Sequence, residues 1–213
     1  MTTPDLHRLD APGRATGIVL MLHGGQADSF AAVGDDSLSW RRSRWMQNQL
    51  VRRAHPHGLS LWLLRYGQRG WNAGSGPVPS PVPDARWALD EVRREHGGLP
   101  VVLLGHSMGA RTAVAVADDP SVTGVVGLAP WLPVDEPVHT LAGRQLALAH
   151  GRADKVTSFA ATEQFVRRAL PIAASAELED MGRVGHYMLR RHGAWNRFAF
   201  SRSLAFVQEH ADR

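Results

Sequence analysis

Short apolar runs alternate with longer amphipathic segments along the chain. Several of the runs are nearly continuous in Val, Leu and Ile, which is typical of strands that are covered on both faces. We therefore predict a strand in each run. The runs comprise residues 18–22, 59–66, 101–104, 122–128, 145–149 and 176–181.

The segments between these runs carry apolar residues at helical spacing. Asp84 is a favourable N-cap for one predicted helix, which the pair Gly97-Gly98 ends, and we expect a surface loop at 76–83, "GPVPSPVP". Another helix is expected to follow Ser107 and to end by Pro120. The remaining predicted helices cover approximately residues 37–54, 159–170 and 193–210.

Alternation of strands and helices predicts an α/β protein with a mostly parallel sheet and helices on both faces. The 213 residues form a single domain, 1–213, by the usual size of domains, and no repeat or linker divides them. Sheets of this class bind ligands at the carboxyl ends of their strands. Residues that follow the strands are therefore the candidates for function.

Composition excludes several classes of function. The net charge is +4, but the arginines are scattered rather than gathered in a stripe, so we expect no nucleic-acid partner. Cysteine is absent, which excludes disulfides and thiolate chemistry. No pair of histidines at helical ligand spacing lies beside a carboxylate, so neither a metal nor another cofactor is expected. The first apolar run is too short for a signal peptide or a membrane span, which predicts a cytoplasmic protein without a membrane partner.

The stretch "VVLLGHSMGA", residues 101–110, places Ser107 at a turn from a strand into a helix. Small residues at Gly105, Gly109 and Ala110 permit a tight, strained turn that exposes the serine hydroxyl above the sheet. Ser107 is therefore a candidate nucleophile. A serine that merely caps the helix would also account for the local pattern.

A serine nucleophile needs a base, and the base needs an orienting acid. Asp154 and His186 each follow a predicted strand, so Ser, Asp and His are expected at one edge of the sheet. Asp180 and Asp135 are alternative acids, and His192 is the rival base, although its place before the last helix favours a capping role.

The segment "MLHGGQADS", residues 21–29, follows the first strong strand and allows close approach of a substrate. We predict that the amide of Met108 and that of either Gly25 or Gln26 stabilise the oxyanion of the transition state. His23 is expected to brace this loop.

These segments resemble the α/β-hydrolase superfamily. "GHSMGA" is similar to its nucleophile elbow, "LHGG" to its oxyanion loop, "HGRADKV" to its acid segment and "GVGHYM" to its histidine segment. The chain also resembles small single-domain bacterial hydrolases of this superfamily. The resemblance implies Ser107 as nucleophile, His186 as base and Asp154 as acid.

Two departures from the superfamily pattern shape the expected fold. Sixteen residues precede Gly17, which leaves room for one short strand and predicts a trimmed sheet of six or seven strands. The segment 129–144 is too short for a cap domain, so we expect an open cleft. Trp71 and Trp131 lie in predicted loops and are candidates for substrate binding.

The resulting hypothesis is a serine hydrolase that cleaves an ester or thioester through an acyl-serine intermediate. Its partner would be a small acyl substrate, and the oligomeric state, monomer or dimer, is open. A serine at position 107 argues against dehalogenases and epoxide hydrolases, which use aspartate there in this fold. The alternatives are a catalytically silent scaffold that acts as a binding protein and an acyltransferase with the same three residues.

Overall fold

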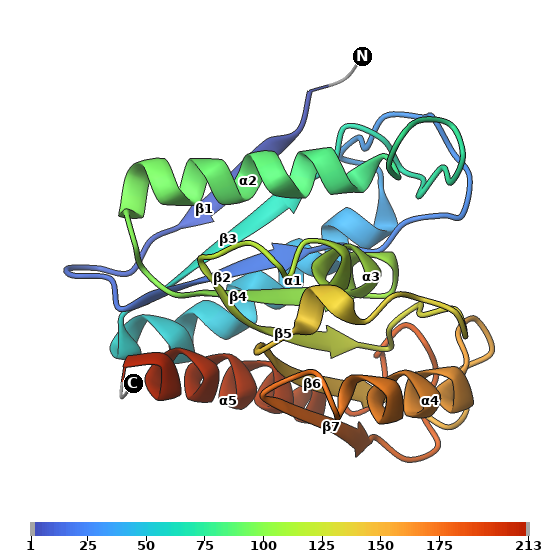
Figure 1. Cartoon of the computed structure of the whole chain (residues 1–213). Coiled ribbons are helices and arrows are strands. Elements are labelled where there is room, and N and C mark those ends of the chain that lie inside the picture. The colour runs from blue at the N-terminus through green and yellow to red at the C-terminus, as the bar shows by residue number, and fades with distance from the viewer. Residues whose placement is uncertain (1–2, 212–213) are drawn as a thin grey trace.

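The computed structural model describes residues 3–211 and contains a seven-stranded sheet in the order β1-β3-β2-β4-β5-β6-β7 (Figure 1). The first strand is antiparallel to β3, and all other neighbouring strands are parallel. The expected fold class, strand number and single short N-terminal strand are confirmed. The strands are β1 Asp5–Leu9, β2 Gly17–Leu22, β3 Leu59–Arg65, β4 Val101–His106, β5 Val122–Leu128, β6 Gln145–His150 and β7 Ser175–Asp180.

Helices cover both faces of the sheet (Figure 1). On one face, α1 (Leu38–Ala54) packs beside α5 (His192–Ala211). The other face carries α2 (Pro81–His96), α3 (Met108–Ala115) and α4 (Phe159–Ala169). Two short 3-10 helices, η1 (His55–His57) and η2 (His139–Leu141), lie in the connections.

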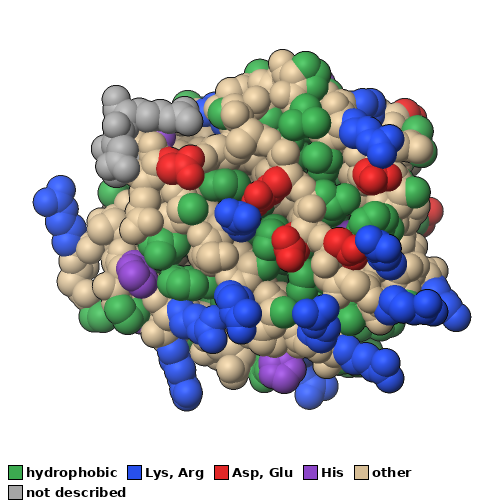
Figure 2. Space-filling model, turned by 90° about the horizontal axis from the view of Figure 1, so that it is seen from below, with side chains coloured by type: hydrophobic (Ala, Val, Ile, Leu, Met, Phe, Trp, Pro, Cys, Tyr) green, Lys and Arg blue, Asp and Glu red, His purple; other side chains and the backbone are tan. Residues whose placement is uncertain are grey.

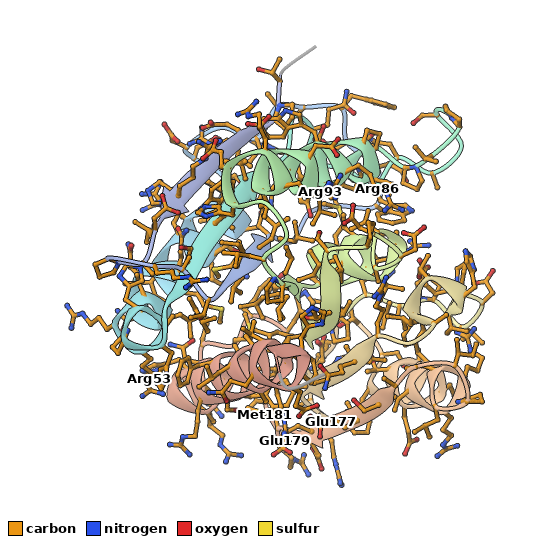
Figure 3. All side chains as sticks on the ribbon, turned by 60° about the vertical axis from the view of Figure 1, so that its left-hand side comes forward. Arg53, Arg86, Arg93, Glu177, Glu179 and Met181 are labelled. Atoms are coloured by element: carbon orange, nitrogen blue, oxygen red, sulfur yellow. The ribbon has the colours of Figure 1, made fainter. Side chains whose placement is uncertain are left out.

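The central strands form the core because both of their faces are covered. Every residue of β2, β4, β5 and β6 is buried, which explains why these strands appear in the sequence as continuous apolar runs. The edge strand β7 differs, because Glu177 and Glu179 lie along it at the border of the sheet (Figure 3). Charges on an edge strand hinder pairing with another chain. Among the described helices, none combines the length and the apolar character needed to cross a membrane.

The beginning of α2 corrects one prediction. Asp84 is not the N-cap: the helix starts three residues earlier, at Pro81, with Ser80 as N-cap. Proline is favoured in the first turn because its fixed φ suits the helix and its missing N–H has no helical partner there. The Asp84 carboxylate instead accepts a hydrogen bond of 2.9 Å from the amide of Gly67.

Charged side chains are distributed over the surface. In the face drawn in Figure 2, Lys and Arg alternate with Asp and Glu in the middle and are more numerous along the lower edge. Arg86 and Arg93 extend from α2 (Figure 3) and form ion pairs with Asp118 and Asp119, which follow α3. These arginines therefore connect two helices.

The parallel strands all end on the same side of the molecule, at the right in Figure 1, where the connecting loops gather. The segments that follow β2, β4, β6 and β7 carry the predicted oxyanion donors and the predicted Ser, Asp and His, and those that follow β3 and β5 carry Trp71 and Trp131.

Candidate active site

Ser107 occupies a strained turn between β4 and α3. Its φ and ψ of 54° and −119° lie in a region that residues with a side chain rarely adopt. The turn is possible because α3 approaches β2 very closely: a Cβ at Gly109 would overlap the carbonyl oxygen of Leu22. This geometry lifts the serine hydroxyl off the sheet and directs the N-terminus of α3 toward it.

The Ser107 hydroxyl donates a hydrogen bond of 3.0 Å to Nε2 of His186 and makes no capping bond to α3. His186 lies in the loop after β7, and its backbone carbonyl accepts a bond of 3.1 Å from Nε2 of His106. Burial, followed by the nearby charge of His186, lowers the pKa of His106 to about 3. His106 is therefore a neutral brace that holds the His186 segment against β4.

On its other side, the imidazole of His186 donates from Nδ1 to Oδ2 of Asp154 at 2.8 Å. The other carboxylate oxygen of Asp154 accepts the amides of Val156 and Thr157 at 2.8 and 2.9 Å. Burial by itself raises the pKa of Asp154, but hydrogen bonds from Thr157, His186 and Val156 outweigh it and lower the pKa to about 2. The carboxylate is thus fixed in place and ionised.

His150, the last residue of β6, is a part of the site that the sequence reasoning missed. Its Nε2 donates to Oδ2 of Asp154 at 3.1 Å, and its Nδ1 is held by the Thr162 hydroxyl at 2.8 Å. Burial lowers the pKa of His150, so it remains a neutral donor. The sequence signal for this role was the position of His150 four residues before Asp154, at the end of the strand that leads into the Asp154 loop.

The rival residues lie elsewhere. Asp180 forms an ion pair with Arg152, and Asp135 is exposed. His192 stacks edge-on against Trp45 at 5.8 Å. None of the three has a hydrogen bond to Ser107 or His186 in the described part of the chain.

The loop after β2 approaches the turn at Ser107. A Cβ at Gly24 would lie 3.4 Å from the Cβ of Ser107. His23 braces this loop, because its Nδ1 donates to the carbonyl of Gly24 at 2.7 Å. Burial lowers the pKa of His23 to about 4, so the brace is uncharged.

The three predicted oxyanion donors differ in their availability. The amide of Gln26 donates to the carbonyl of Arg69 at 2.9 Å, so it is already used within the protein. Neither the amide of Gly25 nor that of Met108 has an acceptor among residues 3–211. Of the alternatives Gly25 and Gln26, only Gly25 therefore has a free amide in residues 3–211, beside that of Met108.

Solved structures share this arrangement of strands and helices. An α/β serine hydrolase homologue from Coxiella burnetii aligns with a TM-score of 0.68 and 16% identity, covering 93% of this chain and 91% of that one. A protein from Xanthomonas campestris described as an α/β serine hydrolase without lid aligns at 0.67 and 15% identity, over 92% and 86% of the two chains. The chain has the α/β-hydrolase fold. A thermophilic esterase from Thermogutta terrifontis is also similar, with a TM-score of 0.68, 17% identity and coverage of 97% and 88%.

A sequence-family model described as serine aminopeptidase S33 matches residues 57–149. The matched segment contains Ser107 and ends before Asp154 and His186. A search of curated proteins finds no match.

Within residues 3–211, this α/β-hydrolase fold carries no cap domain. The segment 129–144 between β5 and β6 contains the single 3-10 helix η2 and no further helix or strand. Trp131 in this segment and Trp71 enclose the guanidinium of Arg111, whose carbon lies 4.6 and 4.2 Å from the two rings. Arg111 is also paired with the buried Glu136 at 2.6 Å. Trp71 and Trp131 line neither the cavity beside Gly25 nor the one beside Trp195. A role of these two tryptophans in substrate binding stays a prediction.

Two cavities adjoin the loops around Ser107 and His186. One of about 650 Å³ opens beside Gly24, Gly25 and Gln26, and one of about 260 Å³ is lined mostly by apolar and aromatic residues, among them Trp45 and Trp195. Arg42, Tyr187 and Leu189 line both and thus separate them. Within residues 3–211, no three His, Cys, Asp or Glu side chains gather in a way that would hold a metal ion.

Proposed function

We propose that the chain hydrolyses carboxylic esters through an acyl-enzyme formed on Ser107. The observation that carries the proposal is the continuous set of hydrogen bonds from Ser107 Oγ through His186 to Asp154, at 3.0 and 2.8 Å. This geometry prepares an alcohol for deprotonation by a correctly oriented imidazole. The similarity in fold to serine hydrolases and to an esterase gives further support.

In the proposed reaction, Nε2 of His186 takes the Ser107 proton as Oγ attacks the ester carbonyl. The charge that develops on the imidazole is stabilised by Asp154, whose bond to Nδ1 also keeps the accepting nitrogen toward the serine. His186 then protonates the leaving alcohol. A water molecule, deprotonated by the same imidazole, attacks the acyl-serine and releases the acid and the free serine.

The negative oxygen of each tetrahedral intermediate would bind to the amides of Gly25 and Met108. Both are free of protein acceptors in the described chain, and Met108 lies at the N-terminus of α3, where the helix dipole favours negative charge. The thioether of Met108 packs against Gly25, so the two donors are held together.

Replacing Gly25 with alanine is expected to lower kcat by about 10²- to 10³-fold, the usual effect of losing one oxyanion donor. A Cβ at this position would overlap both the carbonyl oxygen of Arg69 and the end of the Met108 side chain, so the loop must shift and carry its amide away. Steady-state kinetics with a p-nitrophenyl ester measure the effect. Gly98→Ala is the matched control, because its Cβ would meet open space. Equal kcat for Gly25→Ala and the wild type would remove Gly25 from the proposed pair.

Ester cleavage is favoured over aminopeptide cleavage by the charges near Ser107. An aminopeptidase needs an anion for the substrate amine, and Asp36, the acidic residue that lines the larger cavity, is paired with Arg69 at 3.0 Å. Thioesters have the same requirements as esters and form the second substrate class of the proposal. Acyl transfer to another acceptor would use the same residues and is distinguished by product analysis with competing alcohols.

Covalent labelling tests this function directly. A fluorophosphonate is expected to add one phosphonyl group per chain, on the tryptic peptide 95–111, which contains Ser107. In parallel, p-nitrophenyl esters and thioesters of the same acyl groups are expected to release one acid per bond cleaved. A protein that is neither labelled nor active on any member of this set would be the silent scaffold, and the proposal would be abandoned.

A further inference from the structure

The larger cavity lies against the turn that carries Ser107. Gly24 lines it and is in near contact with the serine, while the start of α1 forms another wall. Tyr187, the residue after His186, and Leu189 complete the cavity on the side of the histidine. A substrate bound at Ser107 would therefore extend into this space.

Arg42, on the first turns of α1, lines this cavity without a protein counterion. Its guanidinium carbon lies 4.9 Å from the centre of the Tyr187 ring, and that ring lies 5.4 Å from the ring of His186. In the part of the chain that the structure describes, Arg42 has no ion pair and no side-chain hydrogen bond. One aromatic ring thus separates an unpaired cation from His186.

The surroundings of Arg42 do not neutralise it. The side chain is partly buried, and burial lowers the pKa of its guanidinium. Asp36 is held by Arg69 at 3.0 and 3.2 Å, and the neutral His23 provides no charge. A cation withdrawn from water without a partner is costly, and a ligand anion would remove that cost.

We propose that Arg42 binds a carboxylate of the substrate, so that the preferred substrates are esters or thioesters that carry one negative charge away from the scissile bond. This inference rests on the proposed hydrolysis at Ser107. A guanidinium presents paired N–H donors that match the two oxygens of a carboxylate, and the Tyr187 ring holds its plane. A single uncompensated cation balances a monoanion, which favours a carboxylate over a phosphate dianion.

Pairs of esters that differ by one charge test the proposal. On the acyl side, p-nitrophenyl hydrogen glutarate is compared with p-nitrophenyl methyl glutarate. On the leaving-group side, 4-acetoxybenzoate is compared with its methyl ester. The measured quantity is the ratio of kcat/KM for the anionic ester to that for the neutral ester.

Arg42→Gln is expected to lower this ratio about 10- to 100-fold for one of the pairs, the usual range for a lost hydrogen bond to a charged group. The pair that responds shows on which side of the scissile bond the anion lies. Arg41→Gln is the matched control, because it removes the same charge from the adjacent, exposed residue. The proposal is overturned if Arg42→Gln leaves both ratios within about threefold of the wild type, or if Arg41→Gln lowers them equally.

A binding measurement separates this inference from the proposed function. Intact p-nitrophenyl hydrogen glutarate and 4-acetoxybenzoate are titrated calorimetrically into Ser107→Ala and into Ser107→Ala/Arg42→Gln. Weaker binding to the double variant by about 10-fold or more supports the anion site, even if the wild type hydrolyses no ester. Equal binding to both proteins refutes the anion site, even if ester hydrolysis is established.

Discussion

Ser107→Ala is expected to lower kcat/KM for p-nitrophenyl esters by about 10⁴- to 10⁶-fold, as in other enzymes in which the nucleophile of such a unit is removed. The reason is that Oγ is the atom acylated in the proposed reaction, and alanine has no substitute for it. The fold should be unaffected, because alanine and serine have the same strain at a φ of 54° and because Oγ makes no capping bond to α3.

Ser158→Ala is the control that separates catalysis from capping. Ser158 is the N-cap of α4, and its hydroxyl accepts the amide of Ala161 at 3.2 Å. Its loss should destabilise the protein by about 1 kcal/mol in urea unfolding while kcat/KM stays at the wild-type value. If Ser107→Ala instead loses stability and keeps its ester turnover, Ser107 is a structural cap and the proposed mechanism is wrong.

Asp154→Asn is expected to lower kcat by about 10⁴-fold, the effect that the same substitution has in a serine protease. Two backbone amides donate to Oδ1, so the asparagine must place its carbonyl oxygen there and turn its NH₂ group toward Nδ1 of His186. The imidazole then has to accept on Nδ1 and carries its proton on Nε2. In that tautomer it cannot receive the proton of Ser107.

Asp180, the alternative acid considered in the sequence analysis, provides the comparison for Asp154. Asp180→Asn changes an exposed carboxylate that is paired with Arg152, and kcat should remain at the wild-type value.

The pKa of Asp154, about 2, means that its carboxylate stays ionised as the pH falls through the usual range of aspartates. A defect of Asp154→Asn should therefore persist at mildly acidic pH. Loss of activity in Asp180→Asn with full activity in Asp154→Asn would reverse the assignment of the acid.

The local pattern of apolar and polar residues predicted most of the fold. It also predicted that Ser107, Asp154 and His186 lie close together at one edge of the sheet. Continuous apolar runs identify buried parallel strands, and residues that follow such strands must lie at one edge of the sheet. The error at α2 has a similarly local origin. Both Pro81 and Asp84 are favoured near a helix start, and only the contact of Asp84 with the amide of Gly67 shows which role the aspartate has.

Other features depend on residues that are distant in sequence. In the sequence, Gly25 and Gln26 are equivalent candidates for the second oxyanion donor. The structure distinguishes them, because the amide of Gln26 donates to the carbonyl of Arg69. In the sequence, His150 is an ordinary strand residue. Only the structure shows the hydrogen bond from its Nε2 to Asp154. Trp71 and Trp131 are both loop residues in the sequence, and their shared contact with Arg111 appears in the structure.

By itself, the sequence determined the order of strands and helices, the strained turn at Ser107 and the edge of the sheet at which an acid and a base must lie. These properties follow from spacing and residue type within short segments. Tertiary structure decided which amide is free, which second histidine supports Asp154 and which unpaired arginine lines the cavity beside Gly24 and Gly25. Hydrogen-bond partners and charge balance belong to pairs of residues that the chain brings together only on folding, so no local pattern contains them.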